Sequence, residues 1–163
     1  VFSKQKGRSE ATIGMPLQDL IENAKKLVVA TTFGSNVARL KTLAEAGVKA
    51  GRSVCLLGRA MRRMIDASVD TGVLSNFPSL ISPEDALQVP RENLLLLATG
   101  SQGERRAATA QLANGKYRGF SLQEGDLFIF SSKTIPGNEK ETIKLAYKMK
   151  PNEIKSNWIF LFK

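Results

Sequence analysis

The sequence predicts an α/β fold, with a three-layer α/β/α arrangement around a mostly parallel, twisted, Rossmann-like sheet. Four short apolar runs, rich in Val, Ile or Leu, alternate with longer stretches whose apolar residues recur at helical spacing. Such alternation is typical of parallel strands joined by helices that cover both faces of the sheet. The length of 163 residues fits one domain, and a chain of this size buries roughly 70% of its unfolded surface.

The first half of the chain alternates helices with strands. We expect a basic irregular lead-in at residues 1–12 and a helix at 15–26. A strand at 27–32, a turn at 33–36, a second helix at 37–50 and a second strand at 53–57 follow. Pro16 suits the first turn of a helix, where its missing N–H is not needed. Both strands are continuous apolar runs, as in strands buried on both faces.

The second half repeats this pattern after a helix from Gly58 to about Thr71. We expect a looser segment with one helical turn at residues 73–92, a third strand at 93–99 and a helix at 100–115 that opens at Gly100. A fourth strand at 126–131, a loop at 132–137 and a helix at 138–148, capped by Asn138, follow. Residues 1–148 then form the domain, lead-in 1–12 included. The tail, residues 149–163, is a possible last strand.

The composition excludes several kinds of chemistry. The chain has no His and one Cys, so it has no Ser-His-Asp or Cys-His pair, no His metal ligand and no site built from several cysteines. Cys55 lies inside a predicted strand, so we expect a buried, inert thiol. The lone Cys fits a reduced, cytoplasmic setting, and no apolar run is long enough for a membrane span.

The net charge of +9 points to a polyanionic partner, or simply to a soluble lysine-rich surface. Ligands of parallel α/β sheets bind beyond the carboxyl ends of the strands. Four strand-to-helix loops meet at that edge, at residues 32–36, 58–63, 99–106 and 131–138. They carry Gly and hydroxyl residues beside predicted helix N-termini, and three carry basic side chains, so together they favour an anion-binding edge.

Sharper nucleotide motifs are missing. The sequence has no G-x-x-x-x-G-K-[ST] run, which excludes a P-loop, and no G-x-G-x-x-G run after the first strand. The loop Gly100-Ser101-Gln102-Gly103 is only loosely similar to a phosphate loop.

The four loops resemble, in order, motifs of the ribonuclease J family. Val28 to Arg39 is similar to its ATFxSN segment, Gly58 to Met61 to its GRSM turn, and Thr99 to Glu104 matches its TGSQGE loop. The run from Phe130 to Lys140 matches its FSSxxIPGNEK segment. The resemblance extends from about Gly7 to Ile143 and corresponds to the β-CASP domain, which this family inserts into a metallo-β-lactamase domain.

The resemblance implies a function for the whole protein. Family members are zinc-dependent ribonucleases with endonuclease and 5′-to-3′ exonuclease activity in bacterial RNA processing and decay, and their zinc ligands belong to the lactamase half. A chain without His cannot hold that zinc. The resemblance therefore implies an isolated accessory half. This half would clamp RNA over an active site that its own lactamase domain supplies. The resemblance also leads us to expect that the parent enzyme, which would contain both domains, forms homo-oligomers.

We expect single-stranded RNA to contact one rim, formed by Ser35, Asn36, Arg59, Arg62, Ser101, Gln102 and Lys133. Arg and Lys would bind phosphate, and the uncharged side chains would contact sugar or phosphate oxygens. Arg62 stands where the family often has an acidic residue, which favours a phosphate contact there. No cofactor and no catalytic residue are expected within the chain. The alternatives are a nucleotide- or phosphosugar-binding module, and a structural or dimerisation domain without RNA affinity.

Overall fold

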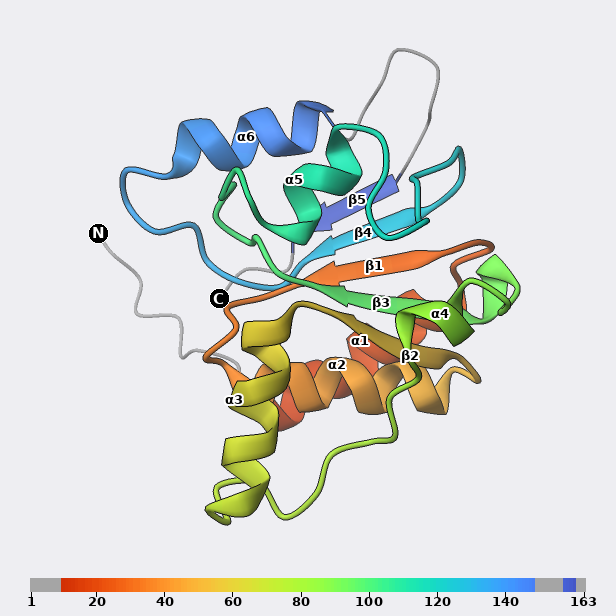
Figure 1. The fold of residues 1–163 in the computed structure, drawn as a ribbon, viewed down its shortest axis with the longest axis vertical. Coiled ribbons are helices and arrows are strands. Elements are labelled where there is room, and N and C mark those ends of the chain that lie inside the picture. The colour runs from red at the N-terminus through yellow and green to blue at the C-terminus, as the bar shows by residue number, and fades with distance from the viewer. Residues whose placement is uncertain (1–9, 149–156, 161–163) are drawn as a thin grey trace.

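A computed structural model of the chain describes residues 10–148 and 157–160. Its centre is a parallel five-stranded sheet in the order β2-β3-β1-β4-β5 (Figure 1). The strands are β1 (Val28–Thr31), β2 (Ser53–Leu57), β3 (Leu94–Ala98), β4 (Leu127–Phe130) and β5 (Asn157–Phe160). β1 lies between β3 and β4, with Val28 opposite both Leu95 and Leu127.

Helices cover both faces of this sheet, so the predicted three-layer α/β fold is confirmed. α1 (Glu10–Glu22), α2 (Val37–Lys49) and α3 (Arg59–Asp70) pack on one face. The other face carries α4 (Pro83–Ala86), α5 (Ala108–Ala113) and α6 (Glu139–Lys148). A short 3₁₀ turn, η1 (Arg91–Asn93), leads into β3.

The apolar runs form strands because each residue has a core on its own side of the sheet. Successive side chains of a strand point to opposite faces. Val29, Cys55, Leu96 and Phe128 therefore join the core beneath α5 and α6. Their neighbours Val28, Val54, Leu95 and Leu127 join the core beneath α1 and α2. All residues of β1, β3 and β4 are buried.

The prediction for the first helix was wrong at both ends. α1 begins at Glu10 rather than near Met15, so Pro16 lies inside the helix and not in its first turn. Ile13 explains the early start, because it extends the apolar stripe of Leu17 and Ile21 onto the same core. Residues 1–9 of the predicted lead-in lie outside the described residues.

Arg52 explains why α1 ends at Glu22 instead of reaching Lys26. Its guanidinium donates hydrogen bonds to the carbonyl oxygens of Ala24 at 2.6 Å, Lys26 at 2.8 Å and Leu94 at 3.2 Å. These carbonyls are therefore taken out of helical pairing and fixed beside the starts of β1 and β3. The periodicity of a single segment cannot reveal a partner 28 residues away.

The prediction that a helix opens at Gly100 was also wrong, because α5 begins only at Ala108. Gly100 and Gly103 have φ angles of +109° and +79°, which a right-handed helix does not allow. Residues 99–107 instead form a long loop at the carboxyl edge of the sheet. Ser101 and Gln102 consequently do not lie at a helix N-terminus.

The remaining elements follow the sequence pattern closely. β2 and the end of α3 lie where they were expected, and β1, β3 and β4 are each two residues shorter than their apolar runs. The single helical turn in residues 73–92 is α4, capped by the Ser82 hydroxyl. Within the tail, residues 157–160 pair with β4 as β5. Among the described residues, no helix is long and apolar enough to cross a membrane.

Candidate functional site

The sheet has a topological switch at the carboxyl end of its central strand. The chain leaves β1 toward α2 on one face, whereas it leaves the flanking strands β3 and β4 toward α5 and α6 on the other face (Figure 1). In α/β sheets, ligands bind at such points. The four loops predicted as an anion-binding edge lie at this end of the sheet.

The loops after β1 and β4 are joined by buried polar side chains. The Thr32 hydroxyl donates a hydrogen bond to the carbonyl oxygen of Ser131 at 2.9 Å. The Arg39 guanidinium, only 6% exposed, donates to the Ser131 hydroxyl at 2.7 Å and to its carbonyl oxygen at 3.3 Å. The buried guanidinium of Arg39 thus joins the start of α2 to the start of the β4–α6 loop.

The loops after β3 and β4 are joined by Gln102, whose side chain is buried. Its amide nitrogen donates to the carbonyl oxygen of Lys133 at 2.9 Å, and its amide oxygen accepts from the backbone N–H of Ile135 at 2.7 Å. Gln102 thereby completes two backbone groups of the neighbouring loop, as a paired strand would. The amide therefore fixes the loop that carries Lys133.

The loops after β2 and β3 touch through Gly58. A Cβ atom at this position would lie 2.4 Å from the methyl carbon of Thr99, so only glycine allows this approach. The backbone N–H of Thr99 also donates to the carbonyl oxygen of Leu57 at 3.3 Å. Each loop of the edge is thus bound to a neighbour. We call residues 32–36, 58–63, 99–102 and 131–138 the braced edge.

The structure places the seven predicted rim residues in two groups. Ser35, Arg59, Arg62 and Lys133 are exposed, and Asn36 is half-buried. Asn36 caps α2, because its side-chain oxygen accepts the backbone N–H of Arg39 at 3.1 Å. Ser101 and Gln102 are buried, with 3% and 5% exposure. Gln102 and Lys133 are brought together, but through the backbone of Lys133 rather than its ammonium group.

The exposed cations are spread along the edge. Arg59 follows β2 and Lys133 follows β4, and β3 and β1 lie between them. Three strand spacings amount to roughly 14 Å. Cations at these two positions can bind separate phosphates of an extended chain. Arg62 lies one turn into α3, where it also borders a hollow of about 370 Å³ with Asp66 and Asp70.

The sequence interpretation missed Arg39 as an edge residue, and it placed Thr32 in an edge loop without naming it among the rim residues. A signal for Arg39 was present, because an arginine in the first turn of a helix opposes the helix dipole and needs a partner elsewhere. The partner, Ser131, lies 92 residues further along the chain. Only the pairing of β1 with β4 brings the two residues together.

The titratable groups near the sheet do not form a catalytic centre within the described residues. Cys55 is fully buried and unbonded to another cysteine, and burial raises the pKa of its thiol to about 11. Asp126 is buried at the opposite edge, before β4, where it pairs with Arg91, and burial raises the pKa of its carboxyl group. No group of three metal-ligating side chains occurs among the described residues.

Fold and edge together define a class of protein: a three-layer α/β domain with a braced, cationic loop edge at its topological switch. Comparison with known proteins identifies the family. Residues 24–149 match the family described as ribonuclease J, beta-CASP domain. The chain therefore belongs to the β-CASP domain family of ribonuclease J, as the four loop motifs indicated.

Curated relatives agree with this assignment. The chain is 41% identical over 132 residues to ribonuclease J of Sinorhizobium meliloti, covering 81% of this chain and 23% of the relative. It is 38% identical over 139 residues to ribonuclease J 1 of Streptococcus pyogenes, covering 84% and 25%. Ribonuclease J of Helicobacter pylori is 33% identical over 152 residues, covering 86% and 22%. The chain spans about a quarter of the length of these relatives.

Proposed function

We propose that this chain is the RNA-binding half of a ribonuclease J-like enzyme of RNA processing and decay. The braced edge would clamp the backbone of single-stranded RNA over an active site in a metallo-β-lactamase domain outside the chain. The observation that supports this is the row of exposed cations along the edge, which extends from the loop after β2, past β3 and β1, to the loop after β4. An extended polyanion fits that spacing.

The rim residues would share the work according to their exposure. Arg59, Arg62 and Lys133 would bind phosphate oxygens, and the exposed hydroxyl of Ser35 would contact phosphate or sugar. The polar groups of Gln102 are already used by the neighbouring loop. We therefore assign Gln102, and the buried Ser101 beside it, to support of the loop rather than to direct contact.

The catalytic metal of such an enzyme would lie outside this chain. The sequence contains no His, its single Cys is buried, and the described residues include no cluster of metal ligands. The residues present do not fit a zinc centre. The proposed partners are therefore RNA and the enzyme's own lactamase domain, and the proposed setting is the cytoplasm.

Filter binding with a labelled 20-nucleotide single-stranded RNA at low salt tests the proposal. We expect Lys133→Ala to weaken binding about tenfold, since one charge-assisted hydrogen bond contributes about 1.5 kcal/mol or more, and Arg59→Ala/Arg62→Ala, which removes two such contacts, to weaken it about a hundredfold. The matched control is Lys25→Ala/Lys49→Ala, which removes two exposed cations at the opposite edge of the sheet. No measurable affinity, or equal losses in the edge and control variants, would contradict the proposal.

A competition experiment separates RNA from a mononucleotide. If the edge holds a chain of phosphates, millimolar nucleoside monophosphate displaces the 20-nucleotide RNA poorly, because it occupies one contact among several. If the chain is a mononucleotide module, the same concentration displaces RNA fully and stabilises the fold against heat.

A further inference from the structure

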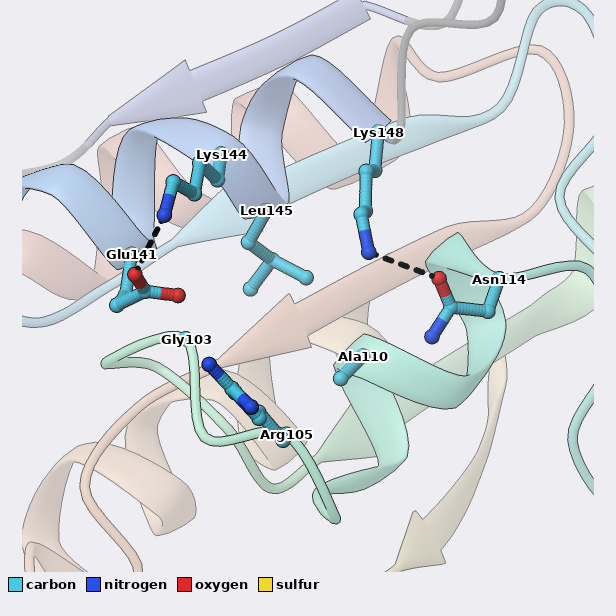
Figure 2. A pocket seen from close by; sticks show the side chains of 8 residues that line it. All are labelled: Gly103, Arg105, Ala110, Asn114, Glu141, Lys144, Leu145 and Lys148. Atoms are coloured by element: carbon cyan, nitrogen blue, oxygen red, sulfur yellow. Dashed lines mark hydrogen bonds and ion pairs between the residues drawn. The ribbon is translucent and has the colours of Figure 1, made fainter.

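A second basic surface lies away from the braced edge, between α5 and α6. A hollow of about 360 Å³ opens there, bordered by Gly103, Arg105, Asn114, Glu141, Lys144 and Lys148 (Figure 2). Its apolar floor includes Leu145 and Ala110. We call this feature the helical hollow. None of the rim residues predicted from the sequence belongs to it.

Two separate segments supply the cations of the helical hollow. Lys144 and Lys148 lie one turn apart on α6, and Arg105 extends from the β3–α5 loop on the other side (Figure 2). The Lys144 ammonium group lies 2.8 Å from a Glu141 carboxylate oxygen. The Lys148 ammonium donates to the side-chain oxygen of Asn114 at 3.2 Å. These contacts hold both lysine side chains toward the hollow.

Glu141 is the one carboxylate among these lining residues, so the lining carries three positive charges and one negative charge. Lys144 is the main cause of a lowered pKa of this carboxyl group, and Arg105 and Lys148 lower the pKa further. The Glu141 carboxylate thus lies in the field of all three cations, which would also attract a bound anion.

The hollow is also connected to the braced edge through the backbone. A Cβ atom at Gly103 would lie 2.7 Å from the backbone carbonyl of Glu141, so the β3–α5 loop packs directly against the first turns of α6. Gly103 follows Gln102, which fixes the loop that carries Lys133. A polyanion that leaves the edge at Lys133 can therefore continue over Arg105 to α6.

We propose that the helical hollow binds a phosphate group of the RNA backbone outside the braced edge, in competition with the Glu141 carboxylate. This inference rests on the proposed function. It extends the RNA path from the sheet edge onto α5 and α6. It also assigns Glu141 a role: its carboxylate screens the cations when no phosphate is bound and weakens the site until RNA displaces it.

Titration with inorganic tripolyphosphate, followed by amide chemical shifts of the 163-residue chain, tests the hollow directly. We expect shifts at Gly103, Asn114 and Leu145, and roughly tenfold weaker binding there in Lys144→Gln/Lys148→Gln. Glu141→Gln removes the competing charge and should strengthen binding several-fold. Lys25→Gln/Lys49→Gln is the matched control and should leave these shifts unchanged. Absent shifts, or equal affinities in all variants, would overturn the proposal.

An RNA arm separates this inference from the proposed function. Lys144→Gln/Lys148→Gln should weaken binding of a 20-nucleotide RNA several-fold, whereas Lys25→Gln/Lys49→Gln should leave it unchanged. Equal RNA affinity of variant and parent would overturn the RNA assignment of the hollow while the braced edge stands. Loss of all RNA binding by the parent chain would instead overturn the proposed function, and with it this extension.

Discussion

Gln102 was predicted to contact RNA, but in the structure its side chain supports a neighbouring loop. A Gln beside Ser and Gly in a loop at the edge of a sheet is typical of a ligand contact, and the sequence was interpreted in that way. In the structure, both polar atoms of its amide complete backbone groups of the β4–α6 loop. The side chain therefore supports the β4–α6 loop, and both polar atoms of its amide are already occupied by that loop.

We expect Gln102→Ala to lower the free energy of unfolding by about 1–3 kcal/mol, because it leaves the N–H of Ile135 and the carbonyl of Lys133 without their partner. Gln111, exposed on α5, is a matched control. Gln111→Ala should change stability by less than about 0.5 kcal/mol. Urea unfolding measures both, and equal losses would contradict the bracing role.

The ionisation of the Cys55 thiol makes the free energy of unfolding depend on pH in the alkaline range. Burial raises the pKa of its thiol from 9.0 to about 11. Between these values the unfolded chain releases the thiol proton and the folded chain keeps it. The free energy of unfolding therefore falls as the pH rises through this range, by up to about 1.4 kcal/mol per unit.

Comparison of the wild-type chain with Cys55→Ala isolates this dependence, since other titrating groups are shared. The difference in unfolding free energy should shrink from pH 9 to pH 11, and the native thiol should react with a disulfide reagent only as the chain unfolds. A constant difference across this range would show that the thiol ionises equally in both states.

At the scale of elements, the loop after β3 depends on a glycine that no other residue can replace. Gly100 has a φ angle of +109°, and a Cβ there would lie 2.0 Å from the hydroxyl of Thr109. That hydroxyl donates to the carbonyl oxygen of Gly100 at 2.9 Å. The loop therefore returns tightly over its own start before α5 begins.

Gly137 provides a control with the same backbone conformation and open space. Its φ angle is +98°, and no atom lies within 4 Å of a Cβ built there. Gly137→Ala should cost about 1–2 kcal/mol from backbone strain alone. Gly100→Ala should cost roughly 3 kcal/mol or more, because overpacking adds to the strain. Thermal unfolding of the two variants tests this, and equal costs would contradict the close approach.

The contrast between strands and loops explains how much could be predicted from the sequence. Runs such as Leu94–Ala98 are apolar throughout, and that property alone predicts a buried strand. The layers and the edge on which the loops meet followed from the alternation. The start of α5 and the end of α1 did not, because positive φ angles and the carbonyl contacts of Arg52 are set by distant packing.

The candidate site could be predicted in place but not in detail. Exposed residues such as Arg59 and Lys133 lie where the loop pattern indicated. Arg39 was missed because its partner is 92 residues away. The helical hollow was missed because α5 and α6 are adjacent only in space.

At the scale of the whole molecule, the cations behind the net charge of +9 have different roles at the two ends of the sheet. Cations such as Arg59, Lys133 and Lys148 are exposed at the carboxyl edge or around the helical hollow, where the proposed RNA contacts lie. At the amino edge, Arg52 binds backbone carbonyls, and Arg91 pairs with the buried Asp126. These two arginines stabilise the fold at the end of the sheet opposite the proposed contacts.

Salt dependence should report this division. Each phosphate contact to single-stranded RNA adds about 0.7 to the steepness with which log affinity falls against log salt concentration. We expect Arg59→Gln and Lys133→Gln each to reduce that slope by about 0.7. Lys25→Gln/Lys49→Gln should leave it unchanged, and a reduced slope in this control would show diffuse attraction by the total charge.

The central position of β1 has a consequence for how the chain folds. Its pairing partners in β3 and β4 are 67 and 99 residues further along the sequence. Pairing at such separation is slow, because the intervening chain must be ordered before the contact forms. During synthesis β1 emerges before both partners, so its edge toward β3 stays open until β3 has emerged, and its edge toward β4 stays open until β4 has emerged. The central strand is therefore paired on both edges only after most of the described domain has been synthesised.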